Sequence, residues 1–265
     1  MTFPRSLSLV QRLDDDPRYE GSIHDTAVAQ ARGFRAALVP GAFVYGHVSR
    51  MAVQAWGQTW IDRGAMGLRF RRPVFDGDTL RLEAGPLEPE SDMPRAAVTV
   101  AGPDPDAVAE GWIGLPSELP RPPDPETLPR GTPGARQTVA AGEIVLGHAF
   151  STVPRPLEIA EIARSAEAMG ETEAIYDAGG LAHSACLMRI AMTDAYSAFR
   201  FPGAVILAEI EAQHFAPVRA GAMIETRGSI RRIWERRVKH FFEAEEWLLA
   251  DGQVAARFRR STIYA

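Results

Sequence analysis

His24 is the side chain near the start of the chain that is best suited to acid–base chemistry. Its imidazole can take up a proton near neutral pH, and a neighbouring carboxylate can fix which ring nitrogen carries that proton. Glu20 and Asp25 lie close to it in the sequence, so either could supply the carboxylate. Plainer roles remain open, because Ser22 or Asp25 could cap a helix over 26–32 and a lone acid is often a solvated surface group. These residues predict a general acid–base site at His24, with either Glu20 or Asp25 as the carboxylate.

A second candidate group lies at the start of a long apolar segment, GAFVYGHVSRMAVQAWG. If this segment is a helix, Gly41 and Ala42 present free backbone N–H groups at its positive end, where they can hold an oxygen that gains negative charge. A Pro-Gly pair before a helix is also an ordinary turn, so both interpretations stay open. Tyr45 lies among aromatic residues that could line a pocket or form the core. A polar stripe at helical spacing, either functional or an exposed or interface face, contains His47, Arg50 and Gln54.

The second half of the chain holds fewer residues of this kind. Tyr176, His183 and Asp194 could act, although a tyrosine is a poor base at pH 7 and His183 could simply open a helix. Cys186 lies on an apolar helical stripe and is expected to be a core thiol. The sequence has no HxxH or HExxH pattern, no GxGxxG or P-loop, and no GxSxG elbow. We therefore expect no metal site and no nucleotide cofactor.

Proline marks the clearest boundary in the chain. The stretch PSELPRPPDPETLPRGTP holds seven prolines, which a helix or a central strand would not tolerate. It predicts a surface linker over 116–136, between an N-terminal domain over 1–115 and a C-terminal domain over 137–265.

The two domains look like distant copies of one unit. FRRPVFDGDTLRLEAG over 70–85 and HFAPVRAGAMIETRG over 214–228 share Pro-Val, two residues and Gly ahead of an alternating strand. Each follows a long amphipathic segment, and short Arg-x-Ala matches fall at similar places in the two segments, over 50–52 and 189–191. The alternation predicts half-buried strands. We predict an α+β fold in which each domain packs one long helix against a curved antiparallel sheet, and in which the two sheets join.

These features resemble a double hotdog protein of the MaoC-like hydratase/dehydratase superfamily. The resemblance rests on the two helix–strand halves, on RFRRPVFDGDTL and on SIHDTAVAQARGFRAALVPGAFVYGH. Ile23-His24 matches the Ile-His of the family motif and Gly33-Phe34 matches its Gly-Phe, whereas Pro40 stands where a His usually opens the central helix.

The departures from the motif are informative. Tyr19 occupies the position of the family's catalytic Asp. In the second half, GETEAIYDAGG over 170–180 resembles a decayed copy, with Glu171, Glu173 and Tyr176 in place of the Asp, Asn and His. The resemblance therefore implies one working site per chain, in the N-terminal half, and a degenerate C-terminal half.

The chemistry that the resemblance implies is addition of water to a 2,3-unsaturated acyl thioester, or its removal from a 3-hydroxy acyl thioester. The enzyme would be a carbon–oxygen lyase acting on an acyl-CoA or an acyl carrier protein. No separate cofactor is implied, because the substrate carries its own CoA or phosphopantetheine. The residues implied for catalysis are His24 with Glu20 or Asp25, and those implied for the oxyanion and the substrate are Gly41, Ala42, Tyr45 and His47.

Two other functions remain open. A hotdog thioesterase commonly uses an acid on the central helix, but the first long segment contains none and Asp194 falls late in the second. A degenerate hotdog could instead bind an acyl group without hydrolysis, or act as a cyclase or isomerase.

Composition narrows the class of protein. The chain has 265 residues, of which 46% are hydrophobic and 24% charged, which is typical of a globular protein. A net charge of −5 argues against a basic nucleic-acid surface, and the single cysteine excludes an intrachain disulfide. The N-terminus lacks the apolar core of a secretory signal, and no apolar run has transmembrane length. We expect a cytoplasmic protein with a small-molecule thioester as partner, no nucleic acid or membrane partner, and a homodimer as one oligomeric option.

Overall fold

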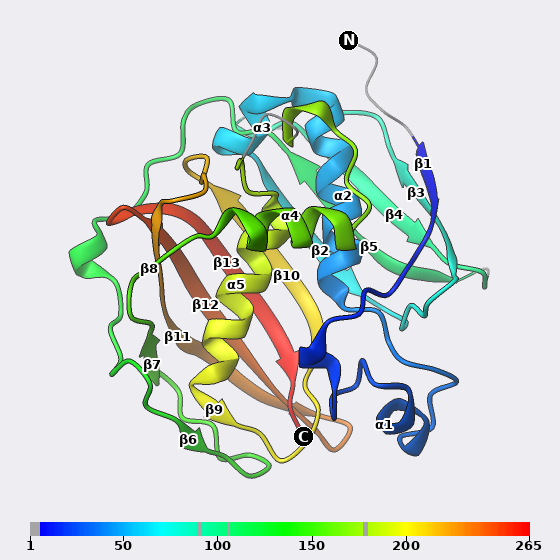
Figure 1. Ribbon diagram of the computed structural model, residues 1–265, viewed down its shortest axis with the longest axis vertical. Coiled ribbons are helices and arrows are strands. Elements are labelled where there is room, and N and C mark those ends of the chain that lie inside the picture. Colours follow the sequence, from blue (N-terminus) through cyan, green and yellow to red (C-terminus); the bar gives the residue numbers. More distant parts are fainter. Residues whose placement is uncertain (1–5, 89–91, 105, 177–179) are drawn as a thin grey trace.

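One large antiparallel sheet runs through the molecule (Figure 1). The computed structural model describes residues 6–88, 92–104, 106–176 and 180–265. Within them, the strands hydrogen-bond in the order β1-β3-β4-β5-β2-β10-β13-β12-β11-β7, with β8 beside β11. The first half contributes β1 (Ser6–Val10), β2 (Ala65–Phe70), β3 (Thr79–Ala84), β4 (Arg95–Ala101) and β5 (Ala107–Gly114). The second half contributes β7 (Ala149–Ser151), β8 (Arg155–Pro156), β10 (Ile206–His214), β11 (Met223–Arg236), β12 (Lys239–Ala250) and β13 (Gln253–Ile263). A separate parallel pair joins β6 (Gln137–Thr138) to β9 (Phe199–Arg200).

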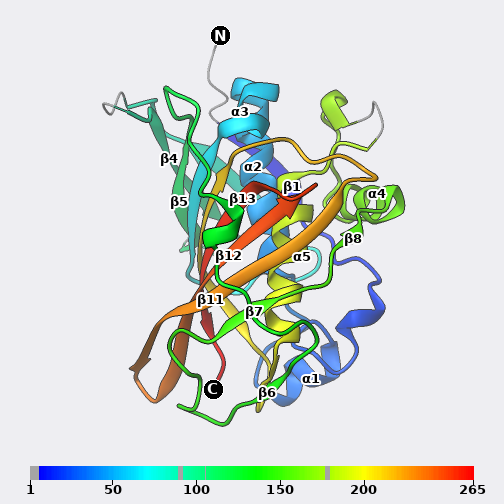
Figure 2. The same ribbon diagram turned by 90° about the vertical axis from the view of Figure 1, so that its left-hand side faces the viewer.

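Two central helices pack against each other on one face of this sheet (Figures 1 and 2). They are α2 (Gly41–Trp56) and α5 (Ser184–Ser197), one from each half. The shorter helices are α1 (Thr26–Ala31), α3 (Gln58–Arg63) and α4 (Ile159–Ala168), and single 3-10 turns form η1 (Pro17–Tyr19), η2 (Pro125–Thr127) and η3 (Ala174–Tyr176). None of the helices among the described residues has both the length and the hydropathy to cross a bilayer.

The two halves meet through a pair of strands, as the repeat predicted. β2 of the first half pairs antiparallel with β10 of the second, with Leu68 opposite Ile210 and Met66 opposite Ala212. All four side chains are buried in one core that spans both halves. The α+β prediction of two helix-on-sheet units with a continuous sheet is confirmed.

Local sequence patterns account for these elements. β3 alternates exposed and buried residues, because its apolar side chains face the helices and its polar ones face solvent. α2 is different: most of its residues are buried, since the sheet wraps it on one side and α5 covers the other. Gly46 allows this close approach, because a Cβ there would lie 2.4 Å from the sulfur of Met169 and 3.3 Å from the Cβ of Ala185.

The proline-rich connection between β5 and β6 stays in contact with the second half. Leu128 is buried in a small cluster with Leu249 and Val254. Arg227 donates from Nη1 to the carbonyl oxygen of Pro125 at 2.8 Å. The segment is therefore anchored at its centre by one apolar side chain and one backbone carbonyl.

Candidate functional site

His24 lies in the turn between η1 and α1, where a backbone carbonyl orients its ring. Its Nδ1 is 2.6 Å from the carbonyl oxygen of Leu38, and Leu38 N in turn donates to Ile23 O at 3.2 Å. A carbonyl oxygen can only accept, so Nδ1 carries the proton and Nε2 keeps its lone pair. Burial lowers the pKa of His24 below its usual value, and the nearby Arg189 lowers it further against the opposing hydrogen bond to Leu38. The ring is thus neutral near pH 7 with a basic nitrogen.

Neither carboxylate suggested by the sequence is hydrogen-bonded to this ring. Asp25 caps α1 instead, accepting from Ala27 N at 2.8 Å and Val28 N at 3.4 Å. Hydrogen bonds from the backbone, that of Gly21 first, lower the pKa of Asp25. Glu20 is exposed, and its side chain makes no hydrogen bond or ion pair with any described residue. The Leu38 carbonyl performs the orienting role expected of an acid.

The start of α2 offers the free donors that the sequence predicted. Pro40 precedes the helix without a side-chain cap, and the first intrahelical bond runs from Phe43 N to Pro40 O at 2.9 Å. The N–H groups of Gly41 and Ala42 have no acceptor among the described residues. This end of the helix follows Leu38 by only a few residues, so the His24 ring is tethered to the segment that leads into these donors. An unprotonated ring nitrogen and two backbone N–H groups without an acceptor therefore lie on neighbouring segments of the chain.

Tyr45 and His47, in contrast, are enclosed in the core. Tyr45 Oη is 2.7 Å from Ser184 Oγ, and His47 Nε2 is 2.9 Å from Gln11 Oε1. Burial lowers the pKa of His47 to about 4, with a smaller effect from the charge of His183. The reason is the double coverage of α2, which places both side chains in internal hydrogen bonds, whereas Gln54 of the polar stripe is exposed.

A buried carboxylate–histidine pair lies in the second half, which the sequence did not predict. Glu171 Oε2 is 2.9 Å from His183 Nε2, and the two side chains are only 3% and 1% exposed. His183 Nδ1 accepts from Ala185 N at 3.1 Å, so Nε2 carries the proton toward Glu171. Burial would raise the pKa of Glu171, but the hydrogen bond and charge of His183 lower it to about 2.

This pair is not part of a nucleophile relay. Ser49 Oγ approaches His183 at 3.4 Å, but at Nε2, the same nitrogen that faces Glu171. A relay needs the nucleophile and the acid on different ring nitrogens. The arrangement instead links α2 to the loop ahead of α5. A signal was present in the sequence, since Glu171 replaces the family's acid and His183 precedes the second central helix.

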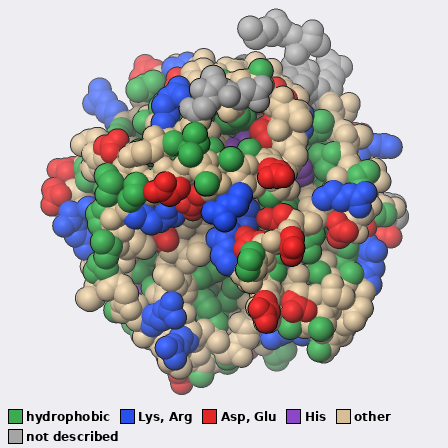
Figure 3. All heavy atoms as spheres, in the orientation of Figure 1, with side chains coloured by type: hydrophobic (Ala, Val, Ile, Leu, Met, Phe, Trp, Pro, Cys, Tyr) green, Lys and Arg blue, Asp and Glu red, His purple; other side chains and the backbone are tan. Residues whose placement is uncertain are grey.

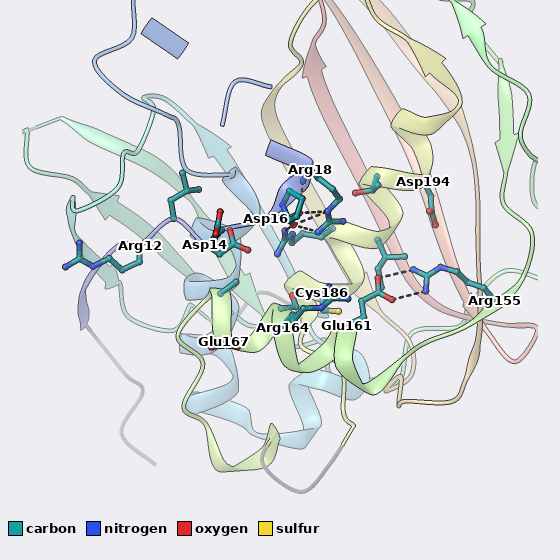
Figure 4. Close-up of a pocket in the computed structure, with 18 residues that line it drawn as sticks. Arg12, Asp14, Asp16, Arg18, Arg155, Glu161, Arg164, Glu167, Cys186 and Asp194 are labelled. Carbon is teal, nitrogen blue, oxygen red and sulfur yellow. Dashed lines mark hydrogen bonds and ion pairs between the residues drawn. The ribbon is translucent and has the colours of Figure 1, made fainter. Parts of the chain in front are cut away.

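A cavity of about 770 Å³ opens between residues 12–18 and the helices α4 and α5 (Figure 4). Its wall mixes both signs of charge, and Figure 3 shows acidic and basic side chains side by side on this face. The ionisable lining residues are Arg12, Asp14, Asp15, Asp16, Arg18, Arg155, Glu161, Arg164, Glu167, Cys186, Arg189 and Asp194. Because the described residues hold no cluster of histidine, cysteine and carboxylate ligands, a metal centre finds no support there.

Arg189 connects this cavity to His24. Its Nη2 lies 3.1 Å from Asp16 Oδ2 and 3.5 Å from Tyr19 Oη, and its guanidinium lies 5.3 Å from the centre of the Phe43 ring. The Tyr19 ring in turn lies 5.1 Å from the His24 ring. Tyr19 takes the position of the family's acid, so a phenol hydroxyl lies between the His24 ring and the cavity.

Asp194 also faces the cavity, although its late position in the second helix had counted against it. Its Oδ2 accepts from Thr226 Oγ1 at 2.6 Å. Burial raises the pKa of Asp194 above its usual value, against the hydrogen bond from Thr226. A carboxyl group with a raised pKa in a cavity is a functional candidate.

No protein family model and no curated protein matches the sequence. Solved structures do match its fold. A candidate MaoC domain protein dehydratase from Chloroflexus aurantiacus aligns with a TM-score of 0.65 at 16% identity, over 99% of this chain and 95% of that one. A conserved protein from Mycobacterium tuberculosis with a double hotdog fold aligns at 0.62 and 14%, over 98% and 96%. The chain has a double hotdog fold.

The same fold also occurs in a protein described as a thioesterase. An acyl-ACP thioesterase from Bacteroides thetaiotaomicron aligns with a TM-score of 0.51 at 9% identity, over 97% of this chain and 96% of that one. At these identities the similarity establishes the architecture, and the chemistry has to be argued from the site.

Proposed function

We propose that this double hotdog protein is a hydratase or dehydratase of acyl thioesters, with His24 as its acid–base group. In the hydration direction, His24 Nε2 takes a proton from water while the water oxygen bonds to C3 of the enoyl thioester. The electron pair of the C2=C3 bond moves toward the thioester oxygen, and the N–H groups of Gly41 and Ala42 hold the enolate that results. The protonated ring then returns a proton to C2, which balances the reaction without a separate cofactor.

The observation that carries this proposal is the hydrogen bond from His24 Nδ1 to the carbonyl oxygen of Leu38. It leaves Nε2 unprotonated and holds the ring to the chain that begins α2. His183, by contrast, uses both ring nitrogens in contacts within the protein.

The test is turnover of enoyl-CoA thioesters, followed by loss of the conjugated thioester absorbance. His24→Ala should lower kcat/KM by a factor of roughly 10² to 10⁴, the range for losing an acid–base group. His240→Ala is the matched control, because His240 lies on β12 away from the cavity lining. Thermal melts of each variant check folding. Equal activity of the wild type and His24→Ala would refute the assignment.

A second candidate function is hydrolysis of the thioester with Asp194 as the base. It is favoured by the raised pKa of Asp194 and by its place in the cavity with Thr226. In that reaction Asp194 takes a proton from water and the hydroxyl attacks the carbonyl carbon. The C–S bond then breaks as the proton on Asp194 passes to the leaving sulfur, which releases the thiol and the carboxylic acid. A thiol reagent in the same assay reports this outcome, and Asp194→Asn should abolish it while hydration, measured separately, remains.

A further inference from the structure

Arg189 and Arg50 lie on the two central helices, and each reaches the loop of the opposite half. Arg189 of α5 contacts Asp16 and Tyr19, which precede α2. Arg50 of α2 contacts Glu173 at 3.2 Å, on the loop that precedes α5, and also donates to the hydroxyl of Thr172 there. The arrangement is reciprocal, so the His24 corner is built from both halves.

The two arginines differ in how many donors remain free. Arg50 uses all three nitrogens, since Nε, Nη1 and Nη2 donate to Glu173, Gly170 O and Thr172 respectively. Arg189 uses only Nη2, and its Nε and Nη1 have no hydrogen-bond acceptor among the described residues. Its side chain is 13% exposed, and it lines the cavity.

The charge beside Arg189 is also only partly neutralised. Asp16 is shared, because Arg18 binds both of its oxygens while Arg189 binds one. The hydrogen bonds from Arg18, with a smaller contribution from the charge of Arg189, lower the pKa of Asp16 to about 2. A second acid of the cavity wall, Asp14, accepts a hydrogen bond from the Tyr19 hydroxyl, whose oxygen is 2.6 Å from Asp14 Oδ1. The guanidinium is therefore held in place and still has donors to offer a ligand.

We infer that Arg189 binds a carboxylate on the acyl group, so that the substrates are thioesters of dicarboxylic acids. This inference rests on the proposed hydratase function and names its substrate class. In a four-carbon enoyl thioester, a terminal carboxylate is bonded directly to C3, the carbon that the water attacks, so the group that binds it has to lie close to His24. Arg189 Nη2 lies 3.5 Å from the hydroxyl of Tyr19, whose ring centre is 5.1 Å from that of His24. A guanidinium with free N–H groups is the donor that best matches a carboxylate.

The experiment compares fumaroyl-CoA with but-2-enoyl-CoA, which differ in having a carboxylate or a methyl group at C4. The wild type should prefer the carboxylated substrate by roughly 10- to 100-fold in kcat/KM, as expected for one charge-assisted hydrogen-bonding group. Arg189→Met should collapse that ratio toward one, and Arg189→Lys should restore part of it. Arg50→Met is the matched control on the other helix and should leave the ratio as in the wild type. An unchanged ratio in Arg189→Met would overturn the inference.

A binding measurement separates this inference from the proposed reaction. S-(3-carboxypropyl)-CoA and S-butyl-CoA cannot react, and calorimetry gives their Kd values on the intact wild-type protein. A tighter Kd for the carboxylated compound that is lost in Arg189→Met supports the carboxylate site even if neither enoyl thioester is hydrated. Equal Kd values for the two compounds on the wild type contradict it even if hydration is found.

Discussion

At His24, the surroundings set the protonation state before a substrate arrives. Burial and the charge of Arg189 disfavour the imidazolium, and the Leu38 carbonyl holds the remaining proton on Nδ1. The same ring can therefore act as a base over the neutral range. The neighbouring hydroxyl of Tyr19 stays protonated, because burial and the hydrogen bond to Asp14 raise its pKa.

The pH profile of hydration follows from this state. Because the pKa of His24 lies below 6.5, kcat/KM should be constant above about pH 6.5 and fall as the ring becomes protonated at lower pH. The measurement is kcat/KM from pH 4.5 to 8.5 on an active enoyl thioester. An activity that still rises between pH 7 and 8 would mean that another group is the base.

Residue patterns alone could predict His24 and the start of α2, but they could not predict the group that orients the ring. That group is a backbone carbonyl, which any residue supplies, so no side-chain pattern reveals Leu38. Asp25 follows His24 directly, yet its carboxylate is taken by the N–H groups of its own helix. The short-range capping bond takes the Asp25 carboxylate in place of a hydrogen bond to the His24 ring.

At the scale of elements, the loop ahead of α5 is tied both to the start of that helix and to α2. Glu171 accepts from its own backbone at Thr172 N and Glu173 N, both at 2.8 Å, and holds His183 at the start of the helix. Arg50 approaches the same carboxylate at 3.6 Å from α2. This loop therefore fixes the contact between the two central helices.

Glu171→Ala should destabilise the protein by about 3 kcal/mol, because it leaves the buried His183 without its acceptor. Glu171→Gln keeps an acceptor and should cost less. Burial raises the pKa of Glu171, but the interaction with His183 and the backbone hydrogen bonds lower it to about 2 in the folded protein. The stabilisation by Glu171 is therefore complete above about pH 4.5 and is lost as the pH falls toward 2. Urea unfolding at pH 7 and pH 4 measures both effects. Equal stability of the wild type and Glu171→Ala at pH 7 would contradict the supporting role.

Periodicity predicted the long helices and the alternating strands because each has one face against the core. It did not predict the ten-residue helix α4, because the sequence shows no motif in the segment where that helix begins. It also did not say which residues of the polar stripe of α2 become internal, since a pattern of spacing does not show what covers a helix. His47 is buried against Gln11 of its own half, Arg50 contacts Glu173 of the other half, and Gln54 is exposed.

For the whole molecule, the β2–β10 pairing and the shared core make the halves interdependent. Within the connecting segment, Arg121 is exposed and contributes little to the association of the two halves. Leu128, in contrast, is packed against the second half. We predict that a protease site placed over 119–121 can be cut without separating the halves. Size-exclusion chromatography of the nicked protein should show both fragments eluting together, with the melting temperature nearly unchanged. Fragments that separate after cleavage would mean that the chain connection, and not the joined sheet, holds the molecule together.

Joining both halves in one chain also frees them from having to stay alike. In a symmetric dimer of single hotdog subunits, every substitution appears twice, so a change that closes one loop closes its twin. Here all three nitrogens of Arg50 donate to the loop ahead of α5, while Nε and Nη1 of Arg189 have no acceptor among the described residues. The peptide link between the halves allows one half to change without the other, a divergence that no exactly symmetric assembly can inherit.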